Sequence, residues 1–182
     1  MSQVKEVINL CSDTVTILAF VLAIIAFLNW KKEHKYAKKL DYILNLEDSF
    51  IILFHNIKQE FKFFSDMQKN LVDIDNKTEE DKNNIYISIK KNYEIYLQEQ
   101  LFSKSLYEYN IALVRIKRFI KDIDKECEVL DFNYLKELNL EGINLTPKWE
   151  DKDKISAQSI KFLERINEIE IEGIKYLQKK YK

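Results

Sequence analysis

Residues 14–39 read TVTILAFVLAIIAFLNWKKEHKYAKK, and this stretch decides how the rest of the chain is organised. Seventeen uncharged residues run from Thr14 to Trp30, and five lysines follow within nine positions. Seventeen helical residues rise about 25 Å, slightly less than the ~30 Å hydrocarbon core of a bilayer. A helix that begins upstream, near Val7, is long enough to span it. The stretch therefore predicts an N-terminal transmembrane anchor.

Two other interpretations of this apolar run are a signal peptide and a buried core helix. A signal peptide needs a positive n-region and a small-residue cleavage site, but Glu6 and Asp13 accompany Lys5 before the run and no A-x-A-like site follows it. A core helix should show a polar face, whereas residues 15–28 contain a single polar residue, Thr16. The composition favours the anchor over both.

The residues that follow the run predict the orientation of the anchor. An indole ring suits the membrane–water interface, and five lysines against one glutamate give this side of the membrane a basic bias. By the positive-inside rule, the N-terminus lies outside and everything after the anchor lies in the cytoplasm. The same lysines also suit anionic lipid head groups, although an ordinary topology signal is the simpler interpretation. The expected membrane-interface residues are Trp30, Lys31, Lys32, Lys35, Lys38 and Lys39.

Length and composition predict an all-α chain with a short appendage. We expect residues 1–30 to form an N-terminal tail and anchor, and residues 31–182 to form a helical bundle domain. Two glycines and one proline in 182 residues argue for long helices, because β-folds need glycine turns. One basic and two acidic residues precede Lys31, which leaves 28 of each sign from Lys31 onward. General nucleic-acid binding is therefore not expected, since such binders usually carry a positive excess.

Apolar residues after the lysines repeat at alternating steps of four and three, which is typical of a helix with a heptad seam. Further apolar residues at 51–53 and 63 widen the stripe, and a wide stripe fits a helix inside a bundle better than a dimeric coiled coil. Because the seam starts within the basic cluster, one helix can continue from the anchor into the bundle. The seam consists of Tyr36, Leu40, Ile43, Phe50, Phe54, Ile57, Phe61, Phe64 and Leu71.

A second helical region is predicted from Thr78, a capping hydroxyl followed by three acidic residues that suit a helix N-terminus. The apolar phase slips near residue 100, and SLYE at 105–108 resembles a capping box. One long helix with a stutter and two separate helices are both open. The first part is marked by Ile85, Ile89, Tyr93 and Leu97; the second part is marked by Phe102, Leu106, Tyr109, Leu113, Ile116, Ile120, Ile123, Cys127 and Leu130.

The C-terminal third predicts one more long helix. Residues 131–150 suggest a short helical turn followed by an irregular loop, and Thr146 with Pro147 suits the start of the last helix. We therefore expect an all-α fold: a single N-terminal transmembrane helix followed by a long-helix, coiled-coil-like bundle. The buried face of the last helix is predicted to hold Ile155, Phe162, Leu163, Ile166, Ile169, Gly173, Ile174 and Leu177.

The sequence contains no motif that indicates catalysis or a cofactor. Cys11 and Cys127 cannot build a disulfide framework or a zinc site, and neither His34 nor His55 has a partner at metal-binding spacing. Carboxylates are many, but they lie on polar helix faces and no pair stands out. We expect no enzymatic activity, no catalytic residue, no metal ligand and no cofactor.

Four residues are candidates for binding an anion or a protein partner. Arg115 and Arg118 lie one helical turn apart in a chain with 26 lysines and three arginines, and Lys121 follows. The rigid fork of arginine suits carboxylate and phosphate oxygens; a solvated face that pairs with Asp122 or with neighbouring helices is the alternative. Trp149, in LTPKWED, suits either a partner anchor or the end of the bundle core.

The stretch AIIAFLNWKKEHKYAKKLDYILNLEDSFIIL at 23–53 resembles a loose group of uncharacterised bacterial proteins with one N-terminal membrane span followed by a helical cytoplasmic domain. The resemblance implies a bacterial inner-membrane setting, in which small anchored proteins often serve in defence against phages or competitors. It implies no activity and no functional residues.

From these observations we expect a membrane-anchored, non-enzymatic helical binding module that forms homo-oligomers and acts with a protein partner, in a phage-defence system. One alternative is an effector that perturbs the membrane by oligomerising, supported by Asp13 near one membrane boundary. Another alternative is a small scaffold or immunity-type protein. The sequence does not identify the partner.

Overall fold

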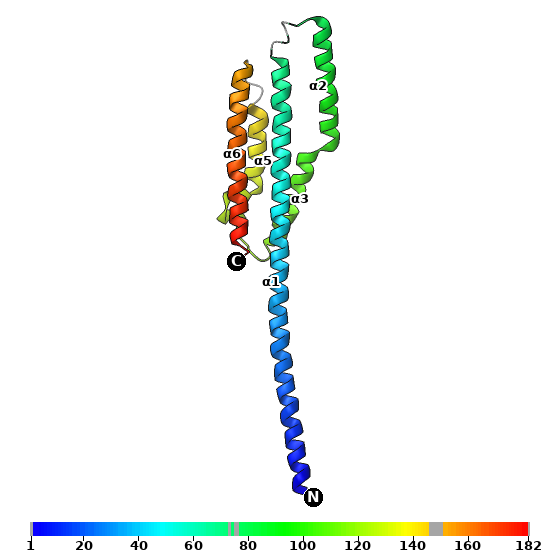
Figure 1. Cartoon of the computed structure of the whole chain (residues 1–182), viewed down its shortest axis with the longest axis vertical. Coiled ribbons are helices and arrows are strands. Elements are labelled where there is room, and N and C mark those ends of the chain that lie inside the picture. Colours follow the sequence, from blue (N-terminus) through cyan, green and yellow to red (C-terminus); the bar gives the residue numbers. More distant parts are fainter. Residues whose placement is uncertain (1, 73, 75–76, 146–150, 182) are drawn as a thin grey trace. The chain divides into compact units, whose positions relative to one another are not determined.

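The computed structural model describes residues 2–72, 74, 77–145 and 151–181, without the side chains of residues 2–14 and 95–99. Within this part of the chain the regular structure is helical, with no strand, so the predicted all-α class is confirmed. The elements are α1 (Ser2–Leu71), α2 (Glu79–Glu99), α3 (Leu101–Ile116), α4 (Ile123–Glu126), the 3₁₀ helix η2 (Glu128–Leu130), α5 (Phe132–Leu145) and α6 (Lys152–Lys179) (Figure 1).

The internal contacts divide the chain into two units, Met1–Asp41 and Tyr42–Lys182. We refer to them as unit 1 and unit 2, and each is described by itself. Unit 1 consists of the N-terminal part of α1, which includes the apolar run and the lysine cluster. Every side chain that is buried in the described part of the chain lies in unit 2.

In unit 2, helix α3 packs antiparallel to α1. The rings of Phe50 and Tyr109 lie 5.8 Å apart, centroid to centroid. Further along α1, the side-chain amide of Asn56 donates to the carbonyl of Leu101, which lies earlier in α3. This inverse order of contacts is that of two neighbouring helices in an up-and-down bundle.

Helices α5 and α6 pack on α1 from another side (Figure 1). The Phe61 and Phe162 rings lie 4.5 Å apart, and the Asn139 amide of α5 donates to the buried Glu60 carboxylate over 3.2 Å. Unit 2 is therefore an up-down-up-down four-helix bundle, in which α2 and α3 together form the second member.

The first predicted seam supplies most of the contribution of α1 to the core. Of its nine residues, Tyr36 is exposed and Leu40, Phe64 and Leu71 are half-buried, while the other five are buried. Leu46 and Leu53, on neighbouring helical positions, are buried as well. A helix that packs against several partners buries a wide stripe, so the prediction of a bundle rather than a two-stranded coiled coil is confirmed.

The predicted helix start at Thr78 is also confirmed, because its hydroxyl accepts a hydrogen bond from the Asp81 backbone amide over 3.2 Å. The question left open near residue 100 is answered by a break of one residue. Gln100 adopts φ 42° and ψ 36°, the left-handed region, between α2 and α3. The capping box predicted at 105–108 is wrong: Ser105 lies inside α3, and its hydroxyl donates to the carbonyl of Phe102.

The regular spacing of the second seam continues to Leu130 and suggested a helix of that length. The structure differs, because the seam does not form one helix up to Leu130. Helix α3 ends at Ile116, and the chain turns back through α4 and η2. A straight helix would carry Leu130 about 20 Å beyond Ile116 and away from the bundle. Folding back instead buries Ile123 and Leu130, and η2 contacts both α5 and α6.

The segment after Leu130 is more helical than predicted. Instead of a short turn, α5 spans 14 residues, capped by Asp131, whose carboxylate accepts from two backbone amides at its start. Its buried face includes Asn139 and Gly142 beside leucines, so the apolar pattern is incomplete. The start predicted for α6 at 146–147 lies outside the described residues; its observed N-cap is Asp151. The predicted face of α6 is confirmed, with six residues buried and Leu163 and Ile174 half-buried.

Candidate functional site

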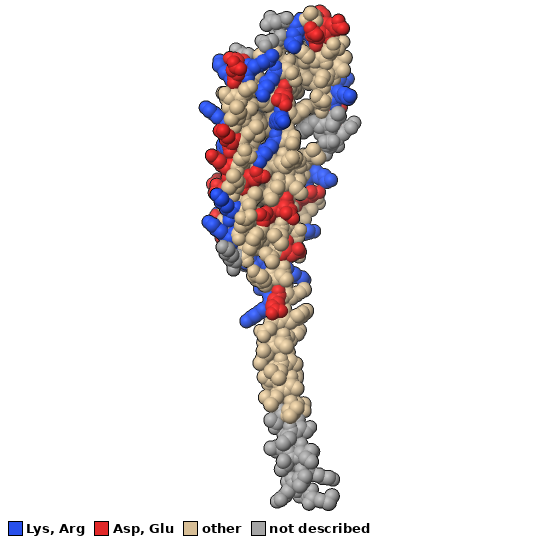
Figure 2. Space-filling view, in the orientation of Figure 1, with Lys and Arg blue, Asp and Glu red and all other residues tan. Residues whose placement is uncertain are grey.

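The apolar run of unit 1 leaves its side chains exposed around the whole helix. Every residue at 15–38 is exposed, including Phe20 at 67% and Leu22 at 65%. Figure 2 shows the part of this stretch before the lysines as a band without charged side chains on the face in view. By length and composition this helix could span a membrane, because it contains an 18-residue stretch with a mean hydropathy of 1.7.

At the end of the run, two faces of the same helix carry different chemistry. On one face the Trp30 and His34 rings stack at 5.4 Å, and the Phe27 ring lies 5.9 Å from Trp30. On the other face, side chains line a shallow groove of about 360 Å³. The residues that line this juxtamembrane groove are Ile25, Leu28, Asn29, Lys31, Lys32 and Lys35.

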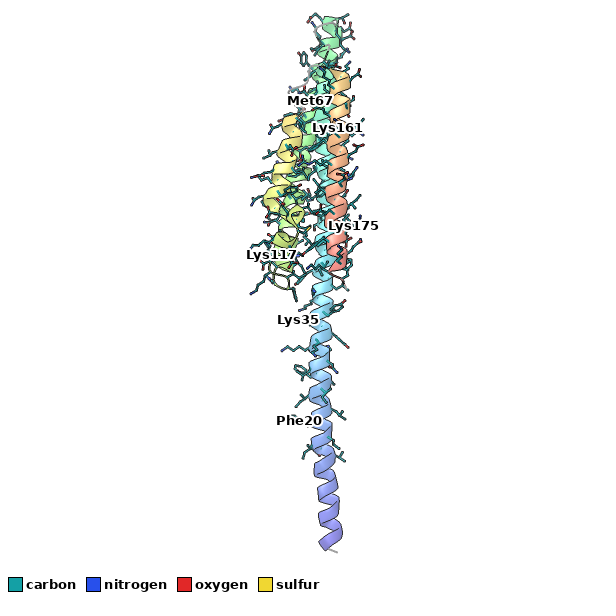
Figure 3. The ribbon with its side chains drawn as sticks, turned by 90° about the vertical axis from the view of Figure 1, so that its left-hand side faces the viewer. Phe20, Lys35, Met67, Lys117, Lys161 and Lys175 are labelled. Atoms are coloured by element: carbon teal, nitrogen blue, oxygen red, sulfur yellow. The ribbon has the colours of Figure 1, made fainter. Side chains whose placement is uncertain are left out.

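The predicted membrane-interface residues all lie on unit 1. Trp30 and the first four lysines are exposed, and Lys39 is half-buried. Figure 3 shows Lys35 extending outward from the helix. Only three of these six line the juxtamembrane groove, and Ile25, Leu28 and Asn29 were not singled out from the sequence. Their spacing of three and four residues was the available signal.

A second hollow lies within unit 2, between the C-terminal part of α1 and helix α2. Its volume is 420 Å³. Phe63 and Met67 of α1 face Ile85 and Ile89 of α2 across it, with polar residues around them. No described side chain at 79–94 is buried, so α2 is held less tightly than the other long helices. Sequence reasoning placed Ile85 and Ile89 on a packed helix face and did not find this hollow.

The predicted arginine cluster is at the end of α3 and in the turn that follows. Arg115, Arg118 and Lys121 are all exposed. None of the three forms an ion pair with another described residue. Trp149, the fourth candidate, lies outside the described residues. The structure thus leaves these three cations in solvent and does not gather them around a common cavity.

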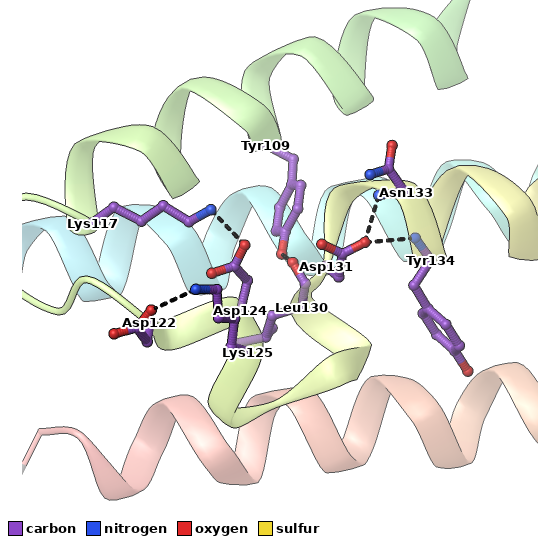
Figure 4. A network of polar contacts seen from close by, with 9 residues as sticks. All are labelled: Tyr109, Lys117, Asp122, Asp124, Lys125, Leu130, Asp131, Asn133 and Tyr134. Carbon is purple, nitrogen blue, oxygen red and sulfur yellow. Dashed lines mark hydrogen bonds and ion pairs between the residues drawn. The ribbon is translucent and has the colours of Figure 1, made fainter.

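Other lysines in this turn do form ion pairs (Figure 4). Lys117 pairs with Asp124, and Lys125 lies 3.1 Å from Asp122. Asp122 thus has Lys125 as an ion-pair partner, while Arg115 and Arg118 lie on a solvated face. These pairs fasten the turn to α4 and leave the arginine side chains outside the network.

Two tyrosines fasten the same end of the bundle. The Tyr109 hydroxyl donates to the Leu130 carbonyl over 2.5 Å, and burial raises the pKa of Tyr109 well above 10.0. Nearer the surface, Tyr176 and Lys180 both donate to the Glu126 carboxylate over 2.6 Å. The hydrogen bond from Lys180, followed by that from Tyr176, lowers the pKa of the Glu126 carboxyl. All these groups act as structural links between elements.

The histidine, cysteine and acidic side chains of the described residues do not gather into a site. Within the described part of the chain, no three His, Cys, Asp or Glu side chains lie close enough to hold a metal ion. Cys127 is a buried thiol, and burial raises its pKa. His55 is exposed on α1, and His34 stacks on Trp30 in unit 1. No protein-family model matches the chain, and no curated protein or solved structure is significantly similar to it.

Proposed function

We propose that the chain is a single-pass protein of the bacterial inner membrane whose N-terminus lies outside and whose bundle lies in the cytoplasm. The observation that carries this proposal is that every apolar residue at 15–28 is exposed, on all sides of the helix. Soluble proteins rarely leave an apolar surface of this size in water, and a bilayer covers it on all sides. The five lysines after Trp30 support the orientation.

We propose further that unit 2 is a non-enzymatic module that binds a protein partner and associates with itself. Two features support this function. The α1–α2 hollow offers apolar side chains at the surface, and Arg115, Arg118 and Lys121 offer cations without an ion pair to the described residues. The assignment to phage defence rests on the resemblance of residues 23–53 alone.

A matched pair of leucine substitutions tests the membrane assignment. Leu22 is 65% exposed in unit 1, and Leu140 is 48% exposed on α5. Leu22→Lys places a charge in the middle of the span, which costs about 3 kcal/mol on insertion scales. We expect the wild type and Leu140→Lys to stay with membranes in alkaline carbonate, and Leu22→Lys to be extracted. Extraction of the wild type would contradict the anchor.

The orientation is tested by protease protection in spheroplasts. Externally added protease should remove a tag on the N-terminus and leave a tag on the C-terminus intact. Replacing all five juxtamembrane lysines with glutamine should weaken or invert this pattern, because they supply the positive bias. Protection of the N-terminal tag in the wild type would show the opposite topology.

A further inference from the structure

The juxtamembrane groove lies on the helix face opposite the stacked rings of Trp30 and His34. Successive helical residues turn by about 100°, so residues 25, 28, 29, 32 and 35 cluster on one face, with Lys31 at its edge, and Phe27, Trp30 and His34 lie on the opposite side. The stack of Trp30 on His34 is thus kept away from the groove. The end of the span has one aromatic face and one basic face.

The lining of the groove changes in character along the helix axis. Ile25 and Leu28 form an apolar floor at the end of the span, and Asn29 follows with an amide donor. Lys31, Lys32 and Lys35 form the rim. No acidic side chain lines the groove. An occupant of matching chemistry has a hydrocarbon part, and directly beyond it a negatively charged group that accepts hydrogen bonds.

Among the molecules around a membrane span, an anionic phospholipid has this order of groups. We propose that the juxtamembrane groove binds one anionic phospholipid, with its phosphate between Lys32 and Lys35 and its first acyl segments along Ile25 and Leu28. Each lysine near an anionic surface contributes about 1 kcal/mol, which corresponds to roughly fivefold in affinity. This inference rests on the proposed membrane anchoring, because the acyl chains must lie beside the span.

Two double variants separate a defined site from a general attraction between charges. Lys32→Gln/Lys35→Gln removes two charges from the rim of the groove. Lys38→Gln/Lys39→Gln removes the same charge a turn further along, from residues that do not line it. All variants are made in the full chain and reconstituted in phosphatidylcholine vesicles. Trace spin-labelled phosphatidylglycerol or spin-labelled phosphatidylcholine then reports the fraction of lipid immobilised by the protein.

We expect the wild type to immobilise phosphatidylglycerol about fivefold or more in preference to phosphatidylcholine. Lys32→Gln/Lys35→Gln should bring this ratio close to one, and Lys38→Gln/Lys39→Gln should keep most of it. An equal loss in both double variants, or a wild-type ratio of one, would overturn the lipid site while leaving the anchor intact. Carbonate extraction of the same samples tests the anchor separately, since a protein released by carbonate fails the proposed function itself.

Discussion

The ring of Phe50 lies directly over Gly173, where α1 and α6 cross. A Cβ atom on Gly173 would lie 2.5 Å from Cζ of Phe50, which is closer than any ordinary contact between carbon atoms. Phe50 is fully buried, and its ring also lies 4.6 Å from Phe54 and 5.8 Å from Tyr109. The two helices can approach this closely because residue 173 has no side chain.

Gly173→Ala should therefore destabilise unit 2. Overpacking typically costs about 1–3 kcal/mol, which exceeds the helix-propensity gain of about 1 kcal/mol from alanine. The free energy of unfolding, measured by denaturant titration in mild detergent, should fall. Adding Phe50→Leu should recover part of the loss, so that the double variant is more stable than the sum of the single effects predicts. If the effects of the two substitutions on the free energy of unfolding are simply additive, the contact between residue 173 and the Phe50 ring is contradicted.

Gln100→Gly tests the left-handed break between α2 and α3. Glycine adopts positive φ without the penalty of about 1 kcal/mol that other residues incur, so we expect stability to stay equal or rise by up to about 1 kcal/mol. Ser103→Gly, at an exposed position inside α3, should instead cost about 0.5–1 kcal/mol. If both variants are destabilised equally, residue 100 is helical.

Tyr109→Phe removes the hydroxyl that donates to the Leu130 carbonyl. Leaving a buried acceptor unsatisfied costs about 1–3 kcal/mol, and the denaturation midpoint should fall accordingly. Tyr107→Phe, at a position 66% exposed on the same helix, is the control and should have little effect. Equal effects of the two substitutions would exclude a structural role for the Tyr109 hydroxyl.

The raised pKa of Tyr109 also predicts a dependence on alkaline pH. The phenol has a pKa near 10.0 when unfolded and well above it when folded. Its contribution to stability is therefore complete below pH 10 and is lost as the pH rises from there through the folded pKa, because only the unfolded chain ionises. Stability measured above pH 10 should decline more steeply in the wild type than in Tyr109→Phe.

Arg115→Gln/Arg118→Gln should leave the stability of unit 2 within about 0.5 kcal/mol of wild type, because both side chains are exposed and outside the ion-pair network. Arg165, the third arginine, lies 2.6 Å from Glu141 on α5, with both side chains nearly half exposed. Arg165→Gln should cost up to about 1 kcal/mol, and less in high salt. A larger loss in the Arg115/Arg118 variant would assign those residues to the fold.

Overproduction of the intact chain should leave the membrane potential of the host unchanged, as followed with a potential-sensitive dye. The described part of the proposed span, residues 15–28, has no polar face that could line an aqueous path. Depolarisation that disappears on deletion of residues 1–30 would instead support the membrane-perturbing effector.

The elements that repeat locally were predictable. The apolar run, the seam in α1 and the buried face of α6 each follow from spacing alone, because a straight helix presents every third or fourth residue to the same neighbour. Thr78 was recognisable as a cap for a similar reason, since its partner at Asp81 is three residues away. Of the candidate site, the lysine cluster was found, but its division into a groove face and an aromatic face was not considered.

Other features depend on contacts between distant residues. Nothing in the spacing from Phe102 to Leu130 indicates that α3 ends at Ile116, because the apolar steps continue through the turn. The turn is stabilised where Tyr109 reaches the Leu130 carbonyl and Lys117 reaches Asp124. The helical pattern correctly predicted that the apolar residues from Phe102 to Leu130 face the core, and it did not predict that the chain reverses after Ile116.

The sequence by itself determined that the chain is helical, where its apolar run lies, and which side of α1 and α6 enters a core. These properties follow from the chemistry and spacing of neighbouring residues. Only the tertiary structure decided the left-handed break at Gln100, the reversal after Ile116, the extent of α5 and the fit of Phe50 on Gly173. Each of these depends on how closely helices from distant parts of the sequence can approach one another, and that distance is set by side-chain shape across the bundle.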